Sequence, residues 1–157
     1  MKIWRVMFSR RLHRSGLSVL LSVIGVAADA QGVAIIEVTS AWARPTVAGQ
    51  LGTGAFMKLK SKHGARVIGA SSDVAGVVEI HEMAMDGNVM LMRPLRALDL
   101  PPGKTIELKS GGYHMMLMDL KRELTAGERI KVDLRIETRE KKLLTQPVEI
   151  EVRARAL

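Results

Sequence analysis

Residues 77–92 run Val-Val-Glu-Ile-His-Glu-Met-Ala-Met-Asp-Gly-Asn-Val-Met-Leu-Met, so two apolar segments flank the polar triplet Asp86-Gly87-Asn88. Asp-Gly between apolar strands is a strong local signal for a β-hairpin, because glycine adopts the backbone angles that a tight turn requires. We therefore predict that Val77 to Met92 form one β-hairpin. This hairpin favours the interpretation that the rest of the chain also folds into β-strands.

Short runs of alternating and β-branched residues recur along the chain at spacings of roughly ten residues, separated by Gly, Pro, Asn and Asp. This pattern is typical of an antiparallel β-sandwich or barrel. No segment indicates a long helix, and no repeat or linker indicates a second domain. The predicted strands are 35–42, 54–60, 67–71, 77–84, 89–95, 105–108, 113–119, 129–137 and 146–152.

The first 30 residues have the order of features found in a secretory signal peptide. Basic side chains gather in residues 2–14, an apolar run covers 16–27, and Ala28-Asp29-Ala30 supplies the small residues of a cleavage site. The apolar run is shorter than the roughly 20 residues that span a bilayer, which argues against a membrane anchor. Ser9-Arg10-Arg11 leaves a twin-arginine export signal open. We expect residues 1–30 to be cleaved and residues 31–157 to form one periplasmic domain without stable membrane insertion.

Charge and composition exclude several classes of function. The chain has 24 Lys and Arg and 16 Asp and Glu, of which residues 1–30 hold five and one, so the remainder carries 19 against 15, a net charge of +4. These charges are dispersed and only 3% of residues are aromatic, which argues against nucleic-acid binding. The chain has no cysteine, so zinc-finger, thioredoxin-like and blue-copper sites are excluded. No Ser/His/Asp or paired-carboxylate arrangement indicates an enzyme.

Methionine is concentrated in two short windows. Of the ten methionines, eight follow residue 30, and seven of these lie in 81–92 or 114–118. Each window also contains a histidine, His81 or His114, although only three histidines follow residue 30. Thioether sulfur and neutral imidazole suit Cu(I), whereas carboxylate and carbonyl oxygens suit Mg²⁺ and Ca²⁺. The joint occurrence predicts a Cu(I) site that has no thiolate and so cannot be lost to disulfide formation.

Strand geometry permits four of these side chains to meet. Residues two apart on a strand face the same side, so His114 and Met116 project together. His81 and Met92 lie on the two arms of the predicted hairpin, where they are candidates for cross-strand neighbours. Two side chains from each element would form a four-coordinate pocket.

The spacing of these residues matches the signature of a known family. His81, ten intervening residues, Met92, twenty-one intervening residues and then His114-Met115-Met116 resemble the H-x10-M-x21-H-x-M motif of periplasmic copper chaperones of the PCuAC type. Further segments that resemble the family are 41–44, 69–72, 78–82, 92–94 and 111–121. The resemblance implies a cupredoxin-like Greek-key β-sandwich or barrel and one Cu(I) bound by His81, Met92, His114 and Met116. It also implies copper delivery to the binuclear centre in subunit II of cytochrome c oxidase, often alongside a Sco-type thiol protein.

The remaining methionines have a plainer interpretation, because methionine is a common filler of irregular cores. We predict packing positions or an outer rim of sulfur for Met83, Met85, Met90, Met115 and Met118. His63 and Glu82 are predicted to be surface residues. We expect a monomeric, non-enzymatic copper chaperone. A copper storage or resistance protein with the same site, and a metal-free β-sandwich interaction module, are the alternatives that the sequence leaves open.

Overall fold

The computed structural model of the chain describes residues 35–154, which belong to one compact unit. This part of the chain contains ten strands, and no helix in it could cross a membrane. The predicted signal peptide lies outside the described residues and stays a prediction. The strands are β1 Ile36–Ala43, β2 Gly52–Ser61, β3 Ala65–Ser72, β4 Ala75–Asp86, β5 Val89–Pro94, β6 Leu98–Leu100, β7 Thr105–Leu108, β8 His114–Leu120, β9 Arg129–Thr138 and β10 Leu143–Val152.

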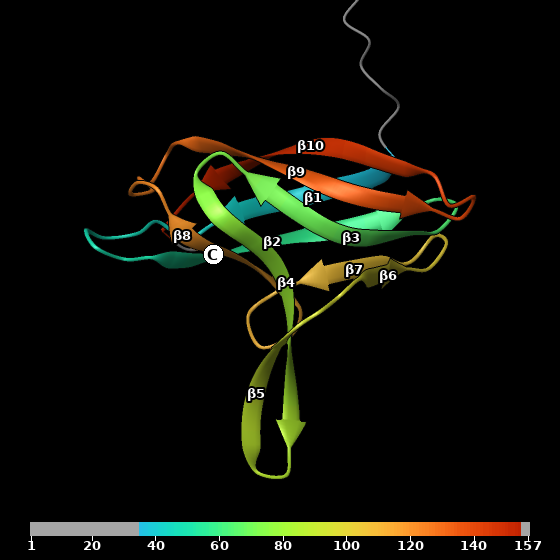
Figure 1. Ribbon diagram of the computed structural model, residues 1–157, viewed down its shortest axis with the longest axis horizontal. Helices are drawn as coiled ribbons and strands as arrows, with labels where there is room; N and C mark the ends of the chain where they lie inside the picture. The colour runs from blue at the N-terminus through green and yellow to red at the C-terminus, as the bar shows by residue number, and fades with distance from the viewer. Residues whose placement is uncertain (1–34, 155–157) are drawn as a thin grey trace, which may run out of the picture. The chain divides into compact units, whose positions relative to one another are not determined.

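Seven of these strands close into a barrel in the order β4-β8-β2-β1-β10-β9-β3, with β3 returning to β4 through the pair Ala70↔Val78 (Figure 1). The other three extend it, since β5 pairs with β4, β6 with β3 and β7 with β2. All pairs in this part of the chain are antiparallel except β1–β10, which is parallel. The predicted all-β fold is confirmed. It is a closed barrel, and its sheet is mixed because the first strand, β1, runs parallel to the last strand, β10.

The barrel core is almost entirely aliphatic. Along β9 the inward side chains are every second residue, and Ile130, Val132, Leu134 and Ile136 are all buried. Val132 lies opposite Val148 of β10, so the two strands present one continuous apolar face. Burial of such side chains away from water is their main favourable contribution to the free energy of folding, at roughly 25 cal/mol per Å² of apolar area buried.

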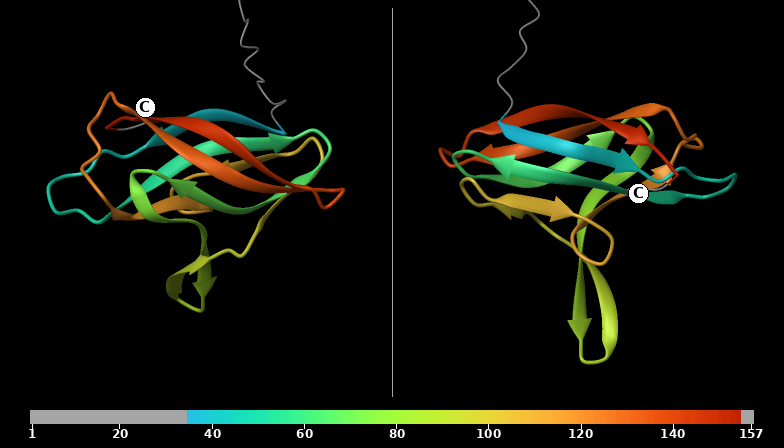
Figure 2. Two further views of the ribbon diagram at one scale, coloured as in Figure 1. Left: turned by 45° about the horizontal axis from the view of Figure 1, so that its top comes forward. Right: turned by 180° about the vertical axis from the view of Figure 1, so that it is seen from behind.

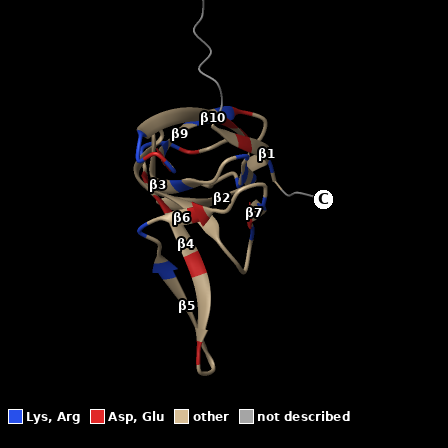
Figure 3. Cartoon of the chain, turned by 90° about the vertical axis from the view of Figure 1, so that its right-hand side faces the viewer, with Lys and Arg blue, Asp and Glu red and all other residues tan. Residues whose placement is uncertain are grey.

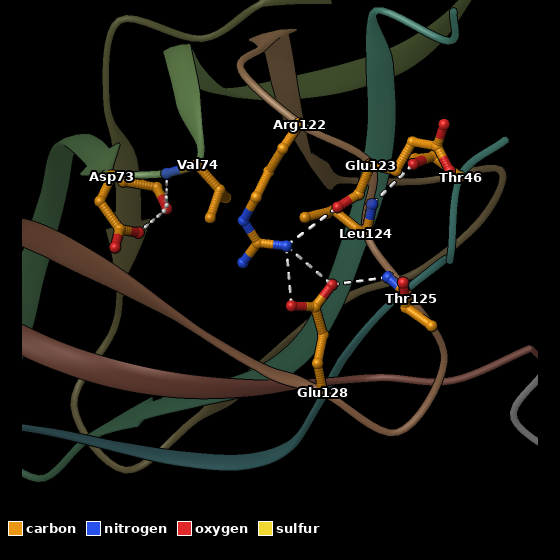
Figure 4. Close-up of polar contacts among 9 residues, drawn as sticks. Thr46, Asp73, Val74, Arg122, Glu123, Leu124, Thr125 and Glu128 are labelled. Carbon is orange, nitrogen blue, oxygen red and sulfur yellow. Dashed lines mark hydrogen bonds and ion pairs between the residues drawn. The ribbon is translucent and has the colours of Figure 1, made fainter. Parts of the chain in front are cut away.

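Two connections hold the C-terminal end of β8 in place (Figure 4). The Leu124 amide donates a hydrogen bond to Thr46 Oγ1 at 2.8 Å, and the leucine side chain is fully buried in the core. Arg122 Nη1 forms an ion pair with Glu128 at 2.8 Å, and the Glu128 carboxylate also accepts a bond from the Thr125 amide. The loop after β8 is therefore anchored, which fixes the strand that carries His114 and Met116.

The hairpin β4–β5 projects from the barrel (Figures 1 and 2). β4 pairs with β8 only as far as His81↔His114, whereas its pairing with β5 continues from His81 to Asp86↔Val89. Gly87, with φ of 61°, is the first of the two turn residues, as a type II′ turn requires. The predicted hairpin is confirmed, and its outer half is a two-stranded ribbon.

Candidate metal centre

The two predicted histidine ligands meet where β4 leaves the barrel. His81 and His114 are directly opposite each other on β4 and β8. Their ring centroids are 5.8 Å apart with an interplanar angle of 70°, and they are only 8% and 6% exposed. Residues far apart in the sequence thus form one buried imidazole pair.

The methionines that share this face of the sheet follow from the register. Met116 lies two residues beyond His114 on β8, and Met83 lies two residues beyond His81 on β4. Met92 is the cross-strand partner of Met83 on β5. Directly opposite residues in a sheet point to the same side, so these three side chains face the side of the histidine pair.

A cavity of about 470 Å³ opens beside the pair, and Met83, Met92, His114 and Met116 all line it. Gly54, the β2 partner of Met116, also lines the cavity, and a Cβ there would lie only 3.0 Å from the Phe56 ring, so a larger residue would require a shift of that ring. His81 does not line this cavity, although its ring neighbours that of His114. The structure therefore brings three of the four predicted ligands to one cavity and places the fourth next to it.

Hydrogen bonds fix which ring nitrogens are available. The His114 Nδ1–H donates to the Gly112 carbonyl at 3.0 Å, because a carbonyl can only accept, and this leaves Nε2 with its lone pair. The His81 Nε2–H donates to the Glu79 carboxylate at 2.9 Å. Nδ1 of His81 is then buried without a hydrogen-bond partner. Metal-binding histidines commonly donate one ring N–H to a carboxylate or carbonyl while the other nitrogen binds the ion, so both rings fit a metal.

The donor atoms that the predicted ligands bring to the cavity are neutral. Across residues 35–154, no group of three or more His, Cys, Asp or Glu is placed to hold a metal ion. The donors that line the cavity include the thioether sulfurs of Met83, Met92 and Met116 and the imidazole of His114, a combination that favours Cu(I). Met92 is 52% exposed, so one edge of the site is open to solvent.

The remaining sequence predictions have mixed outcomes. Met115 is fully buried in the core and His63 is exposed, both as predicted. Met83 was predicted to be a packing residue or part of an outer rim of sulfur, and it lies on the cavity opposite Met92, as such a rim residue would. The position of Met83, two residues after His81 on the same strand, indicated that it shares the face of His81, and the hairpin register places it opposite Met92. Glu79, which binds His81, was not singled out.

The family of the chain follows from its match to a family model over residues 36–148. That family is described as "Putative lipoprotein LpqE-like". The chain belongs to the LpqE-like family. A similar protein is "Putative lipoprotein Lxx21020" of Leifsonia xyli subsp. xyli, which is 33% identical to this chain over 101 residues. The match covers 64% of this chain and 61% of that protein.

Solved structures share the fold of this LpqE-like chain. The copper-bound PCuAC domain from PmoF2 matches with a TM-score of 0.63 and 22% identity, over 79% of this chain and 97% of that one. The solution structure of Cu(I)-DR1885 from Deinococcus radiodurans matches with a TM-score of 0.56 and 27% identity, over 82% and 86% of the two chains. The resemblance to the PCuAC type that the sequence predicted is confirmed.

Proposed function

We propose that this LpqE-like chain is an exported copper(I) metallochaperone that binds one Cu(I) through His81, Met92, His114 and Met116. The observation that carries the proposal is the buried histidine pair, in which each ring has one nitrogen bonded to an acceptor and the other free for a metal. Adjacent thioethers on the cavity supply the soft donors. The copper-bound relatives with this fold support the choice of metal.

The arrangement suits transfer of the ion better than chemistry on it. Thioethers and neutral imidazoles need no deprotonation, so binding one Cu(I) adds a single charge, which a site with one edge open to solvent at Met92 can tolerate. An acceptor can approach through the exposed Met92 and replace the ligands one at a time. We further propose that the chain works in the periplasm and that its acceptor belongs to cytochrome c oxidase assembly, either subunit II or a Sco-type protein.

Purified protein is expected to remove one equivalent of Cu(I) from a colorimetric chelator complex under anaerobic conditions, measured as loss of the chelator absorbance. The loaded protein should then transfer its copper to a soluble domain of oxidase subunit II, measured as copper on the separated acceptor. An unchanged chelator spectrum would favour a metal-free interaction module. Copper that binds but stays on the donor would favour storage.

Glu79→Ala is expected to weaken Cu(I) binding by about 10–100-fold, as loss of an outer-sphere partner typically does. The variant removes the acceptor that holds His81 with its proton on Nε2 and its Nδ1 free. Chelator competition measures the affinity, and ¹⁵N NMR of the metal-free protein should show that the His81 ring loses its single tautomer.

Glu82→Ala is the matched control, because it removes the same charge from the opposite face of β4. It should change neither the Cu(I) affinity nor the ring tautomer. Weaker binding by Glu79→Ala with an unaltered His81 tautomer would contradict the positioning role of Glu79.

A further inference from the structure

Methionines form two successive cross-strand pairs on the projecting hairpin. Met83 is opposite Met92, and Met85 is opposite Met90. The members of each pair face the same side of the ribbon, and the two pairs share that side because they are two residues apart. Four thioethers thus line one face of β4–β5, from the cavity to the turn.

Core packing does not explain the outer pair. Met85 and Met90 are 62% and 56% exposed, whereas Met57 and Met115 in the barrel are 2% and 0% exposed. Among the described strands, β5 pairs only with β4, so no other strand of the sheet pairs with the outer half of the ribbon. The fold therefore exposes the large apolar side chains of Met85 and Met90 to solvent.

Beyond His81, the charged side chains of the hairpin lie on its other face. Glu82 is opposite Arg93, and Arg93 also contacts Asp86 at 3.5 Å. These residues alternate with the methionines along both strands, so they point away from the sulfur face. The hairpin carries acidic segments on β4 and a basic segment on β5 (Figure 3), and beyond His81 its sulfur face offers only neutral, soft donors.

We propose that Met83, Met85 and Met90 form a second binding site for a soft monovalent cation, a thioether site that adjoins the histidine pair. The proposal rests on Cu(I) being the cargo of the chain. Directly opposite Cβ atoms are about 4.5–5.5 Å apart, and the flexible methionine side chain can turn its sulfur toward a common ion. The oxygen-free donor set disfavours Mg²⁺ and Ca²⁺.

The position of this thioether site gives it a role in transfer. Met83 lies on the same cavity as Met92, His114 and Met116, so an ion held at the outer methionines can pass to the histidine site by successive ligand exchanges. Each exchange replaces one sulfur or nitrogen by another while copper stays Cu(I), and it requires neither a proton nor an electron. The outer site has no imidazole and is more exposed, so it binds the ion more weakly than the inner one.

The test is an anaerobic titration of the protein with Cu(I), followed by NMR of ¹³C-labelled methionine methyl groups. The first equivalent is expected to shift the methyl signals of Met92 and Met116, and the second to shift those of Met83, Met85 and Met90. The double variant Met85→Leu/Met90→Leu keeps the apolar volume of the hairpin. It is expected to bind one Cu(I) instead of two and to retain the first with unchanged affinity.

Met118→Leu, on β8 of the barrel, is the control and should retain both equivalents. A second equivalent that leaves the hairpin methyl signals in place, or that binds the double variant as well as the wild type, would overturn the thioether site and leave the histidine site standing. If the wild type binds no Cu(I) at all, the proposed function falls together with this inference.

Discussion

His114→Ala is expected to lower the affinity for Cu(I) by about 100-fold, equivalent to about 2.8 kcal/mol. The substitution removes an imidazole that lines the cavity and is the ring neighbour of His81. Competition with a colorimetric chelator under anaerobic conditions measures the change. Met92→Ala should weaken binding of the same first equivalent markedly, whereas Met90→Ala should not.

His63→Ala makes the same chemical change in the exposed loop between β2 and β3, and it should leave Cu(I) affinity unaltered. Far-UV circular dichroism would verify that the His114 variant keeps its β-structure. A folded His114→Ala protein that competes for Cu(I) as well as the wild type would exclude His114 as a ligand.

Leu134→Ala is expected to lower the free energy of unfolding by about 3 kcal/mol, because it leaves a cavity in a closely packed core. Leu134 is fully buried and lies in the middle of β9, opposite Ala70 of β3 on one side and Gln146 of β10 on the other. Urea denaturation of the metal-free protein measures the loss. The folded variant should still bind Cu(I), because β9 contributes no side chain to the cavity.

Leu143→Ala is the comparison for this variant, since Leu143 is 67% exposed at the start of β10. Its effect on the free energy of unfolding should be small, because truncation there leaves no buried cavity. Equal destabilisation by the two substitutions would contradict the assignment of Leu134 to the core.

Local patterns were sufficient for most of the strands but not for their arrangement. Alternation and turn residues located nine of the ten strands, and Asp86-Gly87-Asn88 located the hairpin turn. The strand β6, Leu98–Leu100, was missed because three residues are too few to establish a period of two. The parallel pairing of β1 with β10 was missed for a different reason: alternation shows which face of a strand is buried and says nothing about the direction of its neighbour.

The same limit applies to the candidate metal centre. Strand parity placed His114 beside Met116, and the turn placed His81 and Met92 on one hairpin. The pairing of His81 with His114 depends on the register between β4 and β8, which no local signal reveals. The hydrogen bonds from His81 to Glu79 and from His114 to Gly112 join residues only two apart in the sequence, but they depend on how each ring is turned, so the free ring nitrogens emerged only from the three-dimensional structure.

The two-residue turn at Gly87 determines which chemistry the hairpin presents. Side chains alternate strictly along a strand, so shifting β5 by one residue against β4 would carry its whole set of side chains to the reverse side. Arg93 would then lie opposite Met83 in place of Met92, and its positively charged guanidinium would repel a metal cation at this face. The length of one tight turn therefore decides whether this face of the hairpin carries thioethers or a guanidinium.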